Sequence, residues 1–254
     1  MSIKRIVLYI SIIVSVLSVV SCKEEFPTLE DFAEYSKYLE NGDLEGVKKY
    51  YKKFGPRSVE QYGVEGLYMI NPLEAALYYN HYDIAEFLLK KGANPDAISP
   101  TMHTPIIFNC IVNNNIKGLE LLIKYNADVS VFNDSDGCST LWYAAATGVE
   151  ILNIIYKRTK DINVKNEDKA TALFGAVIMG RFDCVKFLID HEIDVNAINS
   201  IGCSALMYAV NIGRIDICEY LIEHGADINI VDNEGYDAKW IADELGLQIK
   251  GLTY

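Results

Sequence analysis

SALMYAVNIGRIDICEYLIEHGADIN, residues 204–229, is the stretch that decides the fold. Its apolar residues recur three and four positions apart on both sides of Gly213, a spacing that predicts two short helices separated by a break. Ser204 can cap the first helix, because its hydroxyl can accept a bond from an unpaired backbone N–H. Gly225 can end the second helix in a left-handed conformation. The stretch is therefore predicted to be a helical hairpin followed by a turn.

Variants of this hairpin recur upstream. One apolar anchor position sets the period, with spacings of 33, 35, 32 and 33 residues between Leu73, Ile106, Leu141, Leu173 and Leu206. We place the irregularities in loops, with one extra residue near positions 113–115 and one missing after Gly148. Two residues before each anchor stands a residue that favours helix N-caps, and Pro72 and Pro105 follow at the first helical position. These cap residues are Asn71, Thr104, Ser139, Thr171 and Ser204.

The segments before and after the five units have apolar residues at the same helical spacing and carry more charged residues. Residues 28–54 predict a helical pair whose polar outer side suits a terminal unit with a single neighbour. Residues 55–70 are predicted to be a long loop, and residues 232–250 a closing half-unit. The resulting repeat domain is 28–250, divided into an N-terminal capping repeat and loop (28–70), five repeats (71–231) and a C-terminal capping half-repeat (232–250).

A repeat of this length, reading T-P-L-x-x-A-A, then Gly, then L-L-x-x-G-A-D, is the ankyrin signature, and this chain resembles an ankyrin repeat protein over nearly the whole of 28–250. The resemblance implies an all-α solenoid that acts as a protein–protein interaction module, without cofactor and as a monomer. The family's His after T-P-L is absent here, which predicts looser polar bonding between loops. Its position holds Glu74, Ile107, Trp142, Phe174 and Met207.

The resemblance also implies where a partner would bind. Ankyrin repeat proteins typically use a concave groove built from hairpin fingertips and first helices, so positions in this sequence that match those elements are candidates. Several of them are aromatic or apolar, which suits protein recognition; the alternative is that they pack against the finger loops. The candidate partner-binding residues are Tyr78, Tyr79, Phe132, Tyr143, Met179, Asn199, Tyr208, Asn211 and Ile212.

The first 21 residues differ from the rest. Lys4 and Arg5 precede an apolar run that is short for a membrane span, which predicts a signal peptide over 1–21. Ser21-Cys22 resembles the lipobox of bacterial lipoproteins, so we expect lipidation of Cys22 and a short linker over 22–27. The predicted location is a bacterial membrane, at its periplasmic face or at the outer membrane and cell surface. An ordinary signal peptide or an uncleaved anchor remains the alternative.

Composition and motifs argue against catalysis and nucleic-acid binding. The formal net charge is −12, whereas a phosphate-binding surface needs clustered Lys and Arg. The four histidines have no partner at metal-ligand spacing, and paired carboxylates such as Asp134 and Asp136 fall in turns, so no catalytic or metal residue and no cofactor is predicted. The five cysteines after Cys22 are expected to be free thiols, because equivalent positions of stacked units lie about 10 Å apart, beyond the ~7 Å reach of a disulfide.

We therefore expect a tethered binding module that captures an unknown partner protein and has no reaction of its own. A host-directed surface effector or adhesin is the alternative, and an enzyme or metal protein a weaker one.

Overall fold

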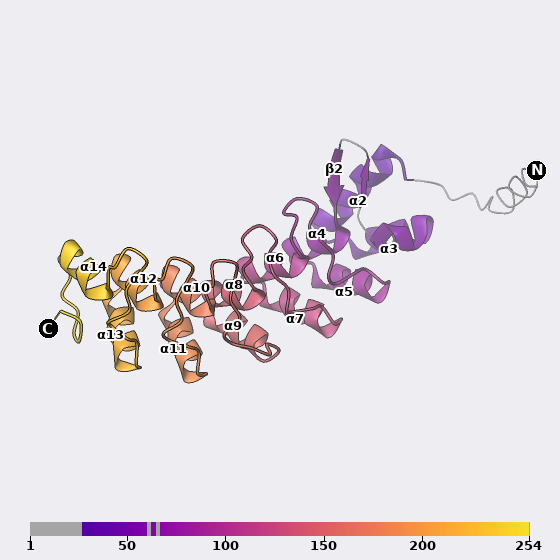
Figure 1. Cartoon of the computed structure of the whole chain (residues 1–254). Helices are drawn as coiled ribbons and strands as arrows, with labels where there is room; N and C mark the ends of the chain where they lie inside the picture. The colour runs from indigo at the N-terminus through magenta and orange to yellow at the C-terminus, as the bar shows by residue number, and fades with distance from the viewer. Residues whose placement is uncertain (1–26, 60–61, 65–66, 254) are drawn as a thin grey trace, which may run out of the picture.

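The computed structural model describes residues 27–59, 62–64 and 67–253, and in them helical pairs stack side by side into an elongated solenoid (Figure 1). The first helices form one row beside the finger loops, and the second helices form another row (Figure 1). The predicted all-α repeat fold is confirmed. The pairs are α4 (Pro72–Tyr78) with α5 (Tyr82–Lys90), α6 (Ile106–Val112) with α7 (Ile116–Lys124), α8 (Thr140–Thr147) with α9 (Val149–Tyr156), α10 (Ala172–Ile178) with α11 (Phe182–Asp190), and α12 (Ala205–Asn211) with α13 (Ile215–Glu223).

Different elements close the two ends. The N-terminal pair is α2 (Leu29–Asn41) and α3 (Leu44–Phe54), and α14 (Ala238–Leu245) packs on α12 at the other end. Residues 55–70, predicted to be a loop, instead form a 3-10 turn, η1 (Gly55–Val59), and an antiparallel hairpin of β1 (Tyr62–Val64) and β2 (Leu67–Ile70). Both strands hold the aromatic and β-branched residues that favour pleated backbone. The predicted signal peptide over 1–21 and Cys22 lie outside the described residues.

The core contains one buried apolar residue, the anchor, from the same position of each first helix, and these anchors follow one another along the solenoid. The equivalent residue of each first helix is no more than 1% exposed, and each anchor packs into a single cluster with its neighbours. Burying a side chain of this size stabilises the fold by about 1.5–3 kcal/mol relative to leaving it in water. A single unit cannot bury its anchor alone, so each depends on the unit next to it. The anchors are Leu73, Ile107, Leu141, Leu173 and Leu206.

The second unit corrects the predicted register. Helix α6 begins at Ile106 with Pro105 as its N-cap, so Ile107 is the anchor, and Thr104 is a buried finger residue. The finger bonds from Ser99 N to Thr104 O (2.8 Å) and from Asn133 N to Cys138 O (2.9 Å) each span one residue more than the matching bond from Asn199 N to Cys203 O (3.0 Å). An extra residue therefore lies in each of the first two fingers, and the placement of one near 113–115 was wrong. Only Gly148 separates α8 from α9, which confirms the missing residue there.

The predicted caps form in three of the five units. The side chains of Asn71, Ser139 and Ser204 accept the backbone N–H of the third helical residue, at 3.1, 3.2 and 3.4 Å. Thr171 stands at the N-cap of α10 without a side-chain bond, and its hydroxyl is buried with no partner. Thr104 is not a cap. The prediction of a capping bond was therefore wrong at Thr104 and Thr171.

A polar bond links neighbouring units at the turn between their helices. At three junctions the N-cap residue of the second helix donates to a carbonyl at or just after the end of the preceding unit's first helix, where backbone acceptors lack partners inside the helix. These bonds are Asn115 Nδ2 to Leu77 O (2.9 Å), Arg181 Nε to Ala146 O (3.1 Å) and Arg214 Nη1 to Gly180 O (2.6 Å).

A second link joins the loops that follow the second helices. A side-chain oxygen of one unit accepts the backbone N–H of the Asp in the next unit's G-A-D position: Asp128 N to Asp96 Oδ1 (2.7 Å), Asp194 N to Asn163 Oδ1 (2.8 Å) and Asp227 N to Asn196 Oδ1 (2.8 Å). These side chains bridge the loops at three junctions without the family's His, and the expectation of looser polar bonding between loops stays a prediction.

Both links are missing between the second and third units. Gly148 takes the place of the second-helix cap residue and has no side chain to donate. Ser130 takes the place of Asn163 and Asn196, and no bond joins it to Asp161 N within the described part of the chain. The contacts that remain at this junction include the edge-to-face packing of Phe108 on Tyr143 at 5.3 Å and bonds between the second finger and α8, such as that from the Tyr143 hydroxyl to Asp136 Oδ2 at 2.6 Å.

We predict that Ser130→Asn stabilises the solenoid, because an amide at this position can accept the Asp161 N–H as Asn196 accepts that of Asp227. One added bond is worth about 0.5–1.5 kcal/mol in the free energy of unfolding. Urea unfolding followed by circular dichroism measures the change, and Asn196→Ser, which removes the bond, should shift the midpoint the opposite way. An unchanged midpoint in Ser130→Asn would contradict the assignment of this junction.

Candidate functional site

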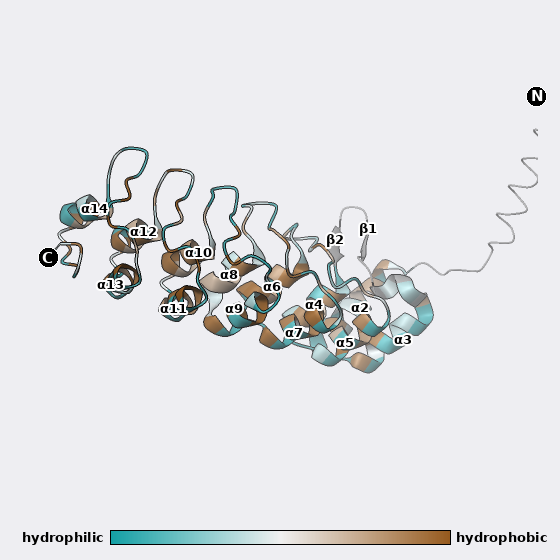
Figure 2. Cartoon of the chain, turned by 60° about the horizontal axis from the view of Figure 1, so that its bottom comes forward, coloured by the Kyte–Doolittle hydropathy of each residue, from teal (hydrophilic) through white to brown (hydrophobic). Residues whose placement is uncertain are grey.

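Apolar side chains are exposed at the last turns of four of the first helices. Figure 2 shows the hydrophobic residues of helices such as α6, α10 and α12 in brown. The anchor and the small residues of each first helix are buried in the core. The remaining residues of the last turn do not take part in this packing, so their side chains can face solvent. Tyr78 is 69% exposed and Met179 is 53% exposed, although solvent would favour charged residues there. We call this set the first-helix row: Tyr78, Tyr79, Val112, Ile178, Met179 and Ile212.

A parallel set lies on the finger loops. Each member occupies the same position, paired by an isolated β-bridge with the N-cap residue of the following first helix. The exposed fraction of these side chains is 43–53%, and the third finger, which holds Lys165 at this position, interrupts the set. We call this set the finger row: Ile98, Phe132, Ile198 and Val231.

Tyr143 and Tyr208 brace the fingers from the first helices, and both are half-buried. The Tyr143 hydroxyl donates to Asp136 Oδ2 at 2.6 Å and accepts from Asn133 Nδ2 at 2.9 Å. Burial, and then the bond to Asp136, raise the pKa of Tyr143 well above its ordinary value. The two tyrosines therefore pack against the finger loops, the alternative that the sequence left open, and present one partly exposed side to solvent.

Asn199 does not belong to the candidate surface, which corrects its prediction as a partner-binding residue. It is 8% exposed, and its Oδ1 accepts the backbone N–H of Ile201 (3.1 Å) and of Cys203 (2.9 Å). Its amide nitrogen donates to the Tyr208 hydroxyl at 3.2 Å. Asn133 makes the same kind of bonds in its own finger. These asparagines shape the turn, a role that Asn commonly takes.

The remaining predicted residues are exposed. Tyr78, Tyr79, Met179, Asn211 and Ile212 lie at the ends of first helices, and Phe132 lies on a finger.

Five members of the two rows are not among the predicted partner-binding residues: Val112, Ile178, Ile98, Ile198 and Val231. Val112 was omitted although the predicted anchors already aligned it with Tyr79, Met179 and Ile212. Ile198 and Val231 lie on the finger loops. Their signal was available, because both align with Ile98 and Phe132 once the units are stacked.

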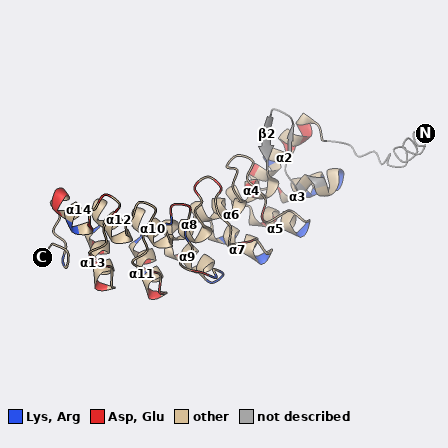
Figure 3. Cartoon of the chain, viewed as in Figure 1, with Lys and Arg blue, Asp and Glu red and all other residues tan. Residues whose placement is uncertain are grey.

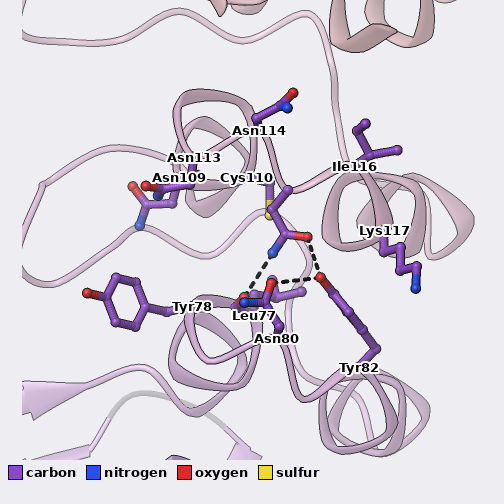
Figure 4. A pocket seen from close by; sticks show the side chains of 11 residues that line it. Leu77, Tyr78, Asn80, Tyr82, Asn109, Cys110, Asn113, Asn114, Ile116 and Lys117 are labelled. Carbon is purple, nitrogen blue, oxygen red and sulfur yellow. Dashed lines mark hydrogen bonds between the residues drawn. The ribbon is translucent and has the colours of Figure 1, made fainter.

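A cavity of about 510 Å³ lies between the first two units, and many of its polar groups bond one another (Figure 4). The Tyr82 hydroxyl lies 2.7 Å from Asn80 Oδ1 and 2.9 Å from Asn115 Oδ1. The amide nitrogen of Asn115 donates to Leu77 O. Burial raises the pKa of the Cys110 thiol on its wall to about 12, so the thiol stays protonated and is a poor nucleophile. The cavity is therefore a groove between repeats that does not assemble a reactive group.

The other described cysteines are also free: Cys138, Cys184, Cys203 and Cys218. Across the described ranges, no group of three His, Cys, Asp or Glu side chains could hold a metal ion. Those ranges also contain no helix long and apolar enough to cross a membrane.

Glu74 is a largely buried carboxylate beside the first finger. It accepts from Ser99 Oγ at 2.7 Å and from Asn109 Nδ2 at 2.5 Å. Burial raises the pKa of Glu74 and outweighs the two hydrogen bonds, which lower it. A charged Glu74 is therefore costly in the folded state.

We predict that Glu74→Gln stabilises the protein in a pH-dependent way. Because the folded pKa lies above the ordinary 4.5, the folded state binds the proton more tightly, and stability contributed by the neutral acid is lost as pH rises through the folded pKa. Glutamine keeps an acceptor for Ser99 and carries no charge. The gain in thermal midpoint over the native chain should be small below pH 4.5 and grow toward neutral pH; a gain that is constant with pH would contradict the assignment.

A family model described as ankyrin repeats (3 copies) matches residues 73–166 and again residues 141–232, which together cover more than half of the chain. No curated protein matches the chain.

Proposed function

This chain belongs to the ankyrin repeat family, and from that premise we propose that it binds a partner protein through the first-helix row and the finger row. Ankyrin repeats support a protein–protein interaction module. The observation that carries the proposal is the recurrence of exposed apolar side chains at equivalent positions of four of the five units, the third unit having none in either row. Single exposed apolar residues are common on soluble proteins, whereas aligned sets of them mark interaction surfaces.

The chemistry of the rows and of the fingertips defines the partner. Tyr78, Phe132 and Met179 are of the residue types that are enriched in interfaces, where they fill apolar pockets. The fingertips beside them carry exposed carboxylates at Asp134 and Glu167. We therefore propose a partner that presents apolar side chains to the rows and basic side chains to the fingertips.

The proposal is tested by replacing exposed row residues, which should leave the fold intact. Met179→Glu combined with Ile212→Glu should remove at least about tenfold of the affinity, because each places an uncompensated charge in a desolvated contact. The measurement is in-cell crosslinking of the full chain, followed by mass spectrometry of the captured proteins.

Val149→Glu is the matched control, because Val149 is 40% exposed but lies at the start of α9, outside both rows. The proposal predicts a protein that is captured by the native chain and by the control but not by the double variant. If the double variant captures the same proteins in the same yield, the rows are not the binding surface.

The finer part of the proposal is a membrane tether. Its support is in the sequence alone: Lys4 and Arg5, the apolar run after them, and Ser21-Cys22. We propose that the chain is an exported lipoprotein whose Cys22 carries the lipid.

Fractionation of cells tests the tether. The native chain should be found with the membranes, and Cys22→Ser should appear in the soluble fraction or as an uncleaved precursor of higher mass. Intact-mass measurement of the native protein should show the added acyl chains on a chain that begins at Cys22. A native chain that keeps residues 1–21 and carries no lipid would contradict the tether.

A further inference from the structure

The ends of the second helices carry charge of one sign in the first part of the solenoid and of the other sign in the last part (Figure 3). From α5 to α9 these ends hold exposed basic side chains, with one exposed acid, Asp161, after the last of them; we call the basic set the basic edge: Lys90, Lys91, Lys124, Lys157, Arg158 and Lys160. Lys52 at the end of α3 extends it, and Lys53 beside it pairs with Asp31 at 2.8 Å. At the ends of α11 and α13 the equivalent positions hold Asp190, Glu192 and Glu223.

Helix dipoles do not explain this division. Cations at a helix C-terminus are stabilising, by about 0.3–1 kcal/mol at an exposed site, and this accounts for the basic ends. The same interaction with the helix dipole disfavours Asp190 and Glu223, which lie in the last turns of α11 and α13. The helices are alike in length and setting, and only the charge changes, so the division needs another cause.

The basic edge retains uncompensated charge. Lys90 and Lys124 share one carboxylate, Glu86, at 3.3 and 2.7 Å, which leaves one positive charge in excess. In the turn after α9, neither Lys157 nor Lys160 has an ion-pair partner within 4.0 Å among the described residues. This turn is therefore the strongest concentration of free cations along the edge.

We propose that the basic edge rests on an anionic lipid bilayer. Its charges are spread over successive units about 10 Å apart, which suits an extended surface better than a small anion. Clusters of four to eight Lys and Arg beside a membrane are the usual means of attraction to anionic headgroups. The edge lies away from the finger loops, so a domain resting on it leaves the fingers free for a partner (Figure 1).

The inference rests on the proposed tether at Cys22. Only five residues separate Cys22 from Thr28, the N-cap of α2, and six extended steps span at most about 20 Å. A lipid at Cys22 would therefore hold the N-terminal units, which carry the basic edge, close to the headgroups. The acidic ends of α11 and α13 would be repelled, so the division of charge orients the solenoid with its N-terminal part toward the bilayer.

Vesicle cosedimentation of the full chain separates the tether from the edge. Phosphatidylcholine vesicles report the lipid anchor, and the gain in binding on vesicles that also contain phosphatidylglycerol reports the edge. We expect the native chain to prefer the anionic vesicles, and added salt to reduce the preference. The triple variant Lys157→Glu, Arg158→Glu and Lys160→Glu should lose at least about tenfold of the preference and bind neutral vesicles as the native chain does.

The matched control is Lys165→Glu, Lys169→Glu and Lys239→Glu, which changes the net charge equally at exposed sites on the third finger and on α14. This control should keep the preference. The proposal is wrong if the edge variant keeps it, if the control loses it to the same extent, or if the native chain shows none and binds duplex DNA through these residues instead. Absence of binding to neutral vesicles in every variant would contradict the tether and leave the preference for anionic lipid as a separate result.

Discussion

The structure depends on the burial of one anchor residue per unit against the unit beside it. Leu141 and Leu173 have almost no exposed surface, yet neither lies in a unit that could cover it alone. Close approach of the helices follows from this constraint. In α10 a Cβ at Gly175 would meet the backbone oxygen of Trp142 at 2.8 Å, so the packing of α8 on α10 requires glycine there. Caps, fingers and charges are arranged around this continuous core.

The repeat architecture could be predicted because five units share the same sequence pattern. An error in the register of one unit does not change the repeat length that the other units define. The register of the second unit could not be settled, because Thr104-Pro105 reads as a cap followed by a first helical residue. The longer finger overrides that local preference: Thr104 closes the finger and Pro105 becomes the cap. The local capping preference of Thr104 therefore predicted the wrong helix start, because the length of the preceding finger decides where the helix begins.

The candidate surface was only partly predictable, for a related reason. Sequence position identifies a residue that could be exposed, but neighbouring loops decide whether it is. Tyr78 is largely exposed, whereas Tyr143 is half-covered by the finger that contains Asp136. Net charge also hides local detail. A value of −12 describes the average, and it conceals the local excess of Lys157, Arg158 and Lys160 that stacking places beside other cations.

The junction between the second and third units has a consequence for cooperativity. In a linear array, the whole unfolds as one body only while the coupling between every pair of neighbours exceeds the instability of the separate units. Gly148 and Ser130 remove two polar links that neighbouring junctions have, so we expect weaker coupling there. We expect partial opening at this junction to divide the array into two blocks, α2 to α7 and α8 to α14, with hydrogen exchange set by the stability of each block separately.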